Sequence, residues 1–278
     1  MQRSARAEVS GLAVRLLSAA ALAPLFLAAI YLGGHYADAV VLLGGAAMAF
    51  EWARLTAATP VLRGAETLAV ATALGAVVLQ ALGTVQGAVA ALALGAVLAL
   101  ALCGRRARAG ALLAFGIVYI GAACLGFLWL RDRPDVGLWL VAWLIAVVWS
   151  TDIGAYLAGR SIGGPRMAKR ISPRKTWSGL AGGLAAAAAA SAILATWVPA
   201  LPGALTLQAP WQLALAGAAL AIVEQGGDLL ESAAKRRVGV KDASGFIPGH
   251  GGVLDRCDGL VAASLALALL VAVLQAGT

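Results

Sequence analysis

Long apolar runs follow one another along almost the whole chain, and short polar segments separate them. Each run has about 17 to 25 residues, which is enough for a helix to cross the hydrocarbon core of a bilayer. The runs are continuously apolar, whereas the strands of a membrane barrel alternate apolar and polar residues. Because a backbone in lipid must satisfy its own hydrogen bonds, this pattern predicts membrane-spanning helices.

The pattern predicts an all-α, polytopic membrane protein with about nine transmembrane helices. We divide it into N-terminal transmembrane helices at 1–135 and a C-terminal region at 136–278, which includes the polar loops 159–177 and 228–258. The first run follows Arg3 and Arg6, but it contains Pro24 and leads into further runs, which favours an uncleaved span over a signal peptide. The predicted spans are 15–33, 37–53, 65–83, 85–103, 109–130, 136–158, 178–198, 210–227 and 259–276.

Composition and charge agree with this topology. The chain is 62% hydrophobic and 12% charged, its mean hydropathy is +0.89, and its net charge is +8. If the N-terminus is cytoplasmic, 19 of the 21 Lys and Arg residues fall on the cytoplasmic side, all except Arg131 and Arg133. This asymmetry is expected of a multispan protein. We therefore interpret the positive charge as a sign of membrane orientation and of attraction to anionic lipid headgroups. We expect no nucleic acid partner.

Two polar loops flank the seventh and eighth predicted spans. One is GRSIGGPRMAKRISPRKTW at 159–177, and the other is SAAKRRVGVKDASGFIPGHGGVLDRCD at 232–258. The second holds basic residues, aspartates, glycines and one of only two histidines between two apolar runs. Both loops emerge on the same side of the membrane, so they can converge on one site.

Acidic residues lie at the ends of the sixth and eighth predicted spans. Asp152 is inside the sixth span, where an ionised aspartate costs about 2.5 to 3.5 kcal/mol and normally faces a partner or a cavity. Glu224, Asp228, Glu231 and Lys235 recur at helical spacing, so a continuing helix would carry them on one face. The alternatives are an interfacial aspartate and an ordinary amphipathic helix leaving the membrane. A bound divalent cation would relieve the repulsion between the carboxylates.

A second acidic pair, Asp255 and Asp258, is spaced i, i+3 in LDRCD. Carboxylates without clustered histidines favour Mg²⁺ over zinc or copper. The three cysteines have no metal or redox spacing, so we interpret them as structural. Cations and a glycine-rich turn around His250 complete a set suited to phosphoryl or nucleotidyl transfer. The cations are Lys235, Arg236, Lys241 and Arg256, and the glycines are Gly249, Gly251 and Gly252.

Each of these parts has a simpler interpretation. His250 by itself is more often a turn residue. SPRKT could be a helix start with Ser172 as the cap and Pro173 in the first turn. The combination on one side of the membrane favours a functional site.

The order of these motifs resembles the signature of the phosphatidate cytidylyltransferase (CDP-diacylglycerol synthase) family. The signature comprises Ser232-x-x-Lys235-Arg236, Lys241-Asp242-x-Ser244 and Pro248-x-His250-Gly251-Gly252-x-x-Asp255-Arg256-x-Asp258. Upstream, the resemblance takes in Gly227-Asp228-Leu229, Ser172-Pro173-x-Lys175-Thr176 and Asp152. It covers roughly the C-terminal half, with departures at Ala234 and Cys257, and the first 130 residues are recognisable only as membrane spans.

The resemblance implies transfer of CMP from CTP to phosphatidic acid in a cytoplasm-facing polar active-site chamber of the plasma (inner) membrane. It implies Mg²⁺ as the cofactor, with Mn²⁺ as a substitute, and it is consistent with a homodimer among the membrane lipids. By resemblance, the metal ligands are Asp228, Asp255, Asp258 and Asp152. The catalytic residues are Asp228, Lys235, Asp242, Asp255, Asp258 and His250, of which His250 orients the turn or moves a proton. The substrate-binding residues are Ser172, Lys175, Thr176, Ser232, Arg236, Lys241, Gly251, Gly252 and Arg256.

Three other functions compete with this one. A CDP-alcohol phosphotransferase needs an Arg where Ala263 stands after Asp258-Gly259-x-x-Ala262, and further aspartates that do not follow. A CTP-dependent polyprenol kinase would transfer the γ-phosphoryl group instead. An ion-coupled transporter would use Asp152, Glu224 and Asp228 as an ion path, but it gives no reason for the HGG and LDRCD motifs.

Overall fold

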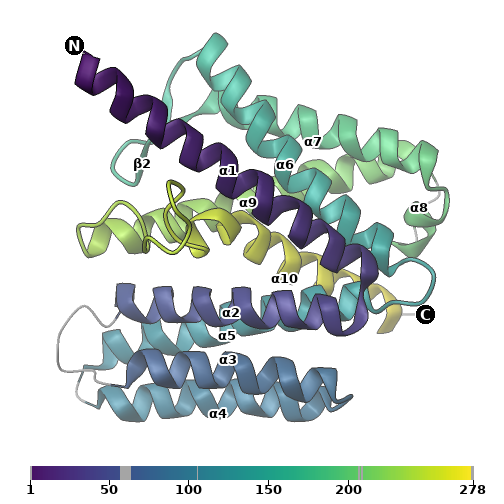
Figure 1. The fold of residues 1–278 in the computed structure, drawn as a ribbon. Helices are drawn as coiled ribbons and strands as arrows, with labels where there is room; N and C mark the ends of the chain where they lie inside the picture. Colours follow the sequence, from purple (N-terminus) through teal and green to yellow (C-terminus); the bar gives the residue numbers. More distant parts are fainter. Residues whose placement is uncertain (1, 57–63, 105, 206, 208, 277–278) are drawn as a thin grey trace. The chain divides into compact units, whose positions relative to one another are not determined.

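The computed structural model describes residues 2–56, 64–104, 106–205, 207 and 209–276, and for 2–13, 16, 202 and 204 it describes the backbone alone. Arg63, Arg105 and the side chains of Arg3 and Arg6, which count toward the predicted charge asymmetry, lie outside the described residues. In the described part of the chain, ten helices and two strands are found (Figure 1). They are α1 (Gln2–Leu32), α2 (Gly34–Thr56), α3 (Ala65–Ala81), α4 (Val85–Cys103), α5 (Ala107–Arg131), α6 (Gly137–Ser161), β1 (Arg166–Ala168), β2 (Ser172–Thr176), α7 (Trp177–Trp197), α8 (Ala200–Ala204), α9 (Pro210–Arg237) and α10 (Leu254–Ala276).

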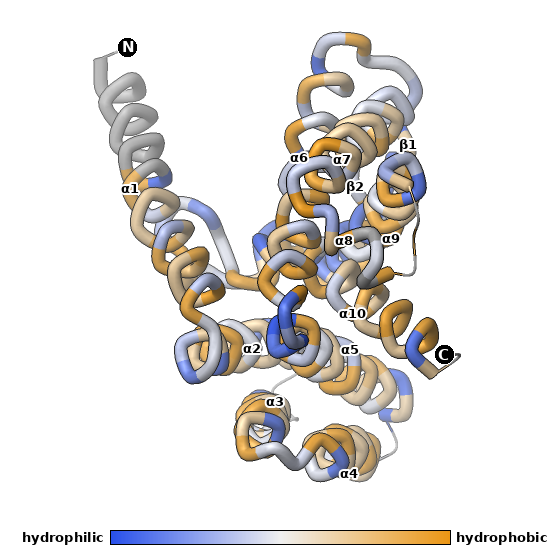
Figure 2. The backbone as a smooth tube through the Cα atoms, turned by 90° about the vertical axis from the view of Figure 1, so that its right-hand side faces the viewer, coloured by the Kyte–Doolittle hydropathy of each residue, from blue (hydrophilic) through white to orange (hydrophobic). Residues whose placement is uncertain are grey.

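The prediction of an all-α, polytopic membrane protein is confirmed. Every predicted span coincides with a helix, and among the described residues the short helix α8 and the strands β1 and β2 were not predicted. Among the described residues, seven helices are long and apolar enough to cross a membrane, and Leu17–Leu32 and Ala65–Ala81 are shorter apolar helices. Figure 2 shows the helices mainly in apolar colours. The count of about nine spans stays a prediction.

Two helices extend beyond the spans predicted for them. Helix α9 continues to Arg237 instead of ending near residue 227, and α10 begins at Leu254 instead of near residue 259. The ends of the segment 228–258, predicted as a loop, are therefore helical. This matters for function because Asp228, Lys235 and Asp258 are held on regular backbone.

The loop 159–177 folds into a small antiparallel hairpin of β1 and β2, in which Ala168 pairs with Ser172. The alternative that Ser172 caps a helix is wrong, since Ser172 begins a strand. Helix α7 is capped instead by Thr176, whose Oγ1 accepts a hydrogen bond from the Gly179 amide at 3.0 Å. The cap satisfies one of the orphan amides of the first helical turn.

The chain divides into two compact units. One comprises Met1–Gly121 and Val238–Cys257, and the other comprises Ala122–Arg237 and Asp258–Thr278. The boundaries fall within α5 and α10, so the polar segment after α9 belongs with the N-terminal helices. The division into 1–135 and 136–278 stays a prediction about function.

In the second unit, α6 and α7 pack closely through small residues. A Cβ added at Gly154 would lie 2.6 Å from the Gly182 carbonyl oxygen, and one at Gly182 would lie 2.3 Å from the Ala158 Cβ. Buried Trp143 donates from Nε1 to Ser191 Oγ at 2.8 Å across the same pair of helices. Small residues and interhelical hydrogen bonds are the usual basis of helix association in lipid. This contact fixes Asp152 on α6 relative to β2, which leads directly into α7.

We expect Gly182→Ala to destabilise the protein, because the new methyl group would overlap Ala158 and force the two helices apart. Overpacking of this kind costs about 1 to 3 kcal/mol. The thermal midpoint of purified protein in detergent measures the effect. Gly75→Ala in α3 is the matched control, since its added Cβ would meet nothing within 4 Å. Equal midpoints for the two variants would contradict the close packing.

Candidate active site

Helix α9 carries the predicted acidic face of the second unit. Glu224, Asp228, Glu231 and Lys235 lie on one continuous helix of 28 residues, so their helical spacing places them on one face. Glu224 and Glu231 are each only 2% exposed. Carboxylates buried to this extent need compensating partners.

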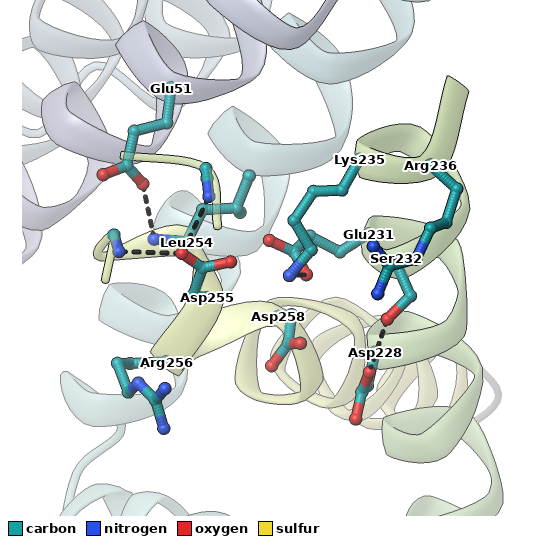
Figure 3. Close-up of polar contacts among 12 residues, drawn as sticks. Glu51, Asp228, Glu231, Ser232, Lys235, Arg236, Leu254, Asp255, Arg256 and Asp258 are labelled. Atoms are coloured by element: carbon teal, nitrogen blue, oxygen red, sulfur yellow. Dashed lines mark hydrogen bonds and ion pairs between the residues drawn. The ribbon is translucent and has the colours of Figure 1, made fainter. Parts of the chain in front are cut away.

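Two lysines supply part of that compensation. Lys175 Nζ, on β2, lies 2.6 Å from Asp228 Oδ2, and Lys235 Nζ lies 2.5 Å from Glu231 Oε2 one helical turn away. The lysine side chains are only 16% and 12% exposed, so water screens these pairs weakly. Figure 3 shows the Lys235 ammonium beside the Glu231 carboxylate. Both lysines were predicted site residues.

Gln225, which the sequence did not single out, connects Lys175 to Glu224. Lys175 Nζ donates to Gln225 Oε1 at 2.8 Å, and Gln225 Nε2 donates to Glu224 Oε2 at 2.9 Å. Glu224 also lies against α10, where a Cβ added at Gly259 would be 2.6 Å from Glu224 Oε1. Glycine at this position therefore lets α10 approach the acidic face of α9.

Asp258 joins this group from the first turns of α10. Its Oδ1 accepts from the Gly259 amide at 2.8 Å, and the charges of Asp228, Lys235 and Asp152 act on it. The charges of Asp152, Asp228 and Lys175 likewise act on Glu224. We call this group, with Glu231, the lysine–carboxylate cluster; its members are Asp152, Lys175, Glu224, Asp228, Glu231, Lys235 and Asp258.

Other predicted residues of the second unit support the cluster or the hairpin. Ser232 Oγ donates to Asp228 Oδ1 at 3.2 Å, the contact drawn in Figure 3. Arg236 Nε donates to the Ile171 carbonyl at 3.2 Å and so ties the end of α9 to the hairpin. Thr176 is buried and caps α7, and the phosphate contact that the resemblance implies for it stays a prediction. Ser172 is half-buried at the start of β2.

The glycine-rich turn belongs to the first unit. Ile247 pairs with Gly251, and the Gly249 and Gly251 backbones have positive φ angles of 76° and 91°. His250 Nδ1 lies 2.9 Å from Ser18 Oγ on α1, and the His250 carbonyl accepts from Arg256 Nε and Nη2 at 3.0 and 2.9 Å. These contacts favour the interpretation that His250 orients the turn.

Asp255 anchors the same turn from the start of α10. Its Oδ2 accepts from the amides of Ala243 at 2.8 Å and Gly252 at 2.7 Å. The contact with Gly252, three residues earlier, resembles the reach-back half of a capping box. Asp242 and Lys241 are exposed beside this segment.

Glu51, on α2, was not among the site residues predicted from the sequence. Its side chain is fully buried and accepts from the amides of Val253 at 3.0 Å and Leu254 at 2.7 Å, the second of which is drawn in Figure 3. It also accepts from Ser244 Oγ. The signal that could have found it is an acidic residue inside a predicted span, the same signal that identified Asp152.

The structure thus groups the predicted residues into two sets, one in each unit. The second unit holds the lysine–carboxylate cluster with Ser172, Thr176, Ser232 and Arg236. The first unit holds Lys241, Asp242, His250, Gly251, Gly252, Asp255 and Arg256. The expectation that Asp228 and Asp255 hold one ion together stays a prediction.

The donors of the lysine–carboxylate cluster are chemically suited to Mg²⁺, because its acidic side chains present oxygen ligands alone. Among the described residues, no group of three or more His, Cys, Asp or Glu side chains is placed to hold a metal. Mg²⁺ is usually bound by one or two carboxylates together with substrate phosphates and water. A carboxylate pair such as Asp228 and Asp258 therefore fits Mg²⁺ that arrives with a nucleotide.

Known cytidylyltransferases are similar to this chain. A family model described as the cytidylyltransferase family matches residues 13–274. Proteins named phosphatidate cytidylyltransferase are similar to the chain. The one from Brucella suis is 48% identical over 160 residues, which are 58% of this chain and 57% of the relative. The one from Pseudomonas aeruginosa is 40% identical over 54% of each chain, and the one from Bacillus subtilis is 40% identical over 51% of this chain and 50% of the relative. The chain spans little more than half the length of these relatives.

Proposed function

This chain belongs to the cytidylyltransferase family, and we propose that it transfers CMP from CTP to phosphatidic acid, giving CDP-diacylglycerol and pyrophosphate. The relatives named phosphatidate cytidylyltransferase support this choice of substrates. The structural observation that carries the proposal is the lysine–carboxylate cluster, in which two mostly buried lysines are paired with carboxylates of helix α9. Such a site offers positive charge to phosphates and oxygen ligands to a divalent ion, within reach of a lipid.

The proposed reaction needs no side-chain nucleophile. An ionised oxygen of the phosphatidate monoester attacks the α-phosphorus of CTP, the new P–O bond forms, and the bond to the β-phosphate oxygen breaks to release pyrophosphate. The protein contributes alignment and charge neutralisation, which dominate catalysis of phosphoryl transfer. Bound Mg²⁺, held by Asp228 and Asp258, would supply Lewis-acid neutralisation of the triphosphate charge.

Lys175 and Lys235 are the cations that we propose bind the phosphates. Each is paired with a carboxylate in the structure, and each has further donors on its ammonium that a phosphate oxygen can accept. Lys175 also donates to Gln225 Oε1, so two contacts orient its ammonium before the nucleotide binds. Pre-aligned charges of this kind stabilise a transition state without reorganising during the reaction.

We also propose that the site faces the cytoplasm of the plasma (inner) membrane, where CTP is found. The basic residues of the hairpin support this orientation, because Arg166, Lys169, Arg170 and Arg174 lie between two apolar helices and are exposed. The homodimer that the resemblance suggested stays a prediction. An accessibility assay on single-cysteine variants in the hairpin, read in sealed inner-membrane vesicles, would test the orientation.

Purified protein incubated with CTP, phosphatidic acid and Mg²⁺ is expected to form CDP-diacylglycerol and pyrophosphate in equal amounts. CTP labelled at the α-phosphate should transfer its label to lipid, whereas CTP labelled at the γ-phosphate should not. The opposite labelling would indicate a lipid kinase, and intact CTP would leave a transporter or another activity. Either result would overturn the proposal.

Chelation is expected to stop the reaction. Thorough EDTA treatment should abolish product formation, and added Mg²⁺, or Mn²⁺ in its place, should restore it, because the triphosphate charge would otherwise remain unneutralised. Product formation is measured before and after metal addition in the same sample. Turnover that persists after chelation would remove the metal from the mechanism.

A further inference from the structure

Glu51 combines complete burial with three donors from a segment about 200 residues away in the sequence. Its Oε1 accepts from the Val253 amide and from Ser244 Oγ, and its Oε2 accepts from the Leu254 amide. Val253 directly precedes α10 and Leu254 begins it, and the backbone amides at a helix start have no partner within the helix. Glu51 therefore acts as a cap that another helix supplies to α10.

Burying a carboxylate at this place costs free energy unless specific partners compensate its charge. Moving an ionised group out of water is unfavourable, and simple filling of space would be achieved better by an apolar residue. The amides and the positive end of the α10 dipole compensate the charge only when the turn keeps its observed geometry. The charge of Glu51 and the conformation of the turn therefore depend on each other.

Gly252 shows how closely the carboxylate and the turn fit. A Cβ added at Gly252 would lie 2.6 Å from Glu51 Oε1 and 2.8 Å from its Cδ. Gly252 has no positive φ, so packing against Glu51 is what excludes a side chain there. Gly251 differs, because its φ of 91° would strain any side chain whatever the space.

Asp255 holds the same segment from its other side. Its Oδ2 binds the amides of Ala243 and Gly252, while Glu51 binds Ser244, Val253 and Leu254. The two carboxylates thus fix both ends of residues 243–254, which include the His250 turn. The position of Asp255 at the start of α10 is set in part by Glu51.

We propose that Glu51 is a positioning residue for the cytidylyl transfer, an inference that rests on the proposed function. Its carboxylate holds residues 243–254 and the start of α10 in the conformation that places Asp255 for the reaction. It contacts backbone and a serine hydroxyl, so it acts through the turn. The N-terminal helices then contribute to catalysis as well as to membrane insertion.

Glu51→Gln tests the role of the charge with almost no change in volume. One of the two oxygens becomes an NH₂ group that faces a donor, so the turn loses at least one bond. We expect kcat per folded molecule at saturating substrates to fall by about 10²-fold, as a small misplacement of catalytic groups can do. Amide hydrogen exchange in residues 243–254 should accelerate. Glu66→Gln in the first turn of α3 is the matched control and should leave both unchanged.

A size-compensation pair tests whether the contact between Glu51 and Gly252 sets the conformation of the turn. Gly252→Ala alone should lower kcat, because its methyl group collides with the Glu51 carboxylate. Glu51→Asp retracts the carboxylate by one methylene, so the double variant Gly252→Ala/Glu51→Asp should recover activity relative to Gly252→Ala. Gly251→Ala should not be rescued by Glu51→Asp, since its strain comes from φ.

Several results would overturn the inference. One is unchanged kcat in the folded fraction of Glu51→Gln, and another is a double variant no better than Gly252→Ala. If Glu51→Gln does not fold, Ser244→Ala provides a second test, because it removes one hydrogen-bond donor to the Glu51 carboxylate. It should still lower kcat and accelerate amide hydrogen exchange in residues 243–254. Wild-type protein that fails to transfer CMP would refute the proposed function, whereas unaltered hydrogen exchange in Glu51→Gln would refute the anchoring itself.

Discussion

Asp228→Asn is expected to lower kcat/KM for CTP by about 10³-fold, the scale of losing one preorganised electrostatic group at a reacting centre. The substitution keeps the shape of the side chain but removes the charge that holds Lys175, at 2.6 Å, and that would bind Mg²⁺. Initial rates of CDP-diacylglycerol formation in detergent measure the effect. Asp135→Asn, in the turn between α5 and α6 of the same unit, is the matched control, because asparagine tolerates its φ of 61°.

The companion variant Lys175→Met separates catalysis from simple charge balance. Removing one member of a partly buried ion pair leaves the other uncompensated, whereas removing both can be nearly neutral for stability. If the pair only stabilises the fold, the double variant Asp228→Asn/Lys175→Met should regain activity. We expect it to remain as inactive as Asp228→Asn alone, with a thermal midpoint restored toward wild type. Recovered turnover would contradict the assignment of both residues to the reaction.

The long helices could be predicted because the signal for a membrane span is local. An apolar run of sufficient length must be helical in lipid, whatever surrounds it. The ends were harder, since an apolar run ends where charges begin but the helix need not. Helix α9 continues for ten residues beyond Gly227, supported by the Glu231–Lys235 pair at i, i+4.

The hairpin shows a different limit. Ser172-Pro173 has the chemistry of a helix start, yet pairing of Ala168 with Ser172 makes the segment a strand. Thr176, four residues later, is equally able to cap a helix, and it is the residue that does so. Local propensity could not choose between two caps when a strand partner lay upstream in the chain.

The residues of the candidate site could be predicted where they are charged and lie within or beside an apolar run. Asp152, Asp228 and Lys235 were found this way. Gln225 and Ser18 carry no such signal, because their roles follow from single contacts with Lys175 and His250 that the fold creates. Glu51 had the signal, but its partners lie about 200 residues away, and nothing local indicates a cap supplied to another helix.

Asp255→Asn is expected to abolish turnover, by about 10³-fold or more, while the protein stays folded and inserted. The fold should survive because asparagine retains the hydrogen-bond acceptor that anchors the turn. Its side-chain oxygen can still accept from the amides of Ala243 and Gly252, both of which bind the single atom Oδ2 in the structure. The anchoring of the turn should therefore survive in this variant, and only the negative charge is lost.

Comparison with Asp255→Ala makes the result decisive. Asp255→Ala removes both the anchor and the charge, so it should accelerate hydrogen exchange in residues 243–254, whereas Asp255→Asn should not. Asp38→Asn on α2, whose partner is the exposed His35, is the control within the same unit. Near-wild-type synthesis by Asp255→Asn would mean that Asp255 serves the turn alone. Asp255 would then be a scaffold for the turn, and Asp228 and Asp258 of the lysine–carboxylate cluster would remain the proposed metal ligands.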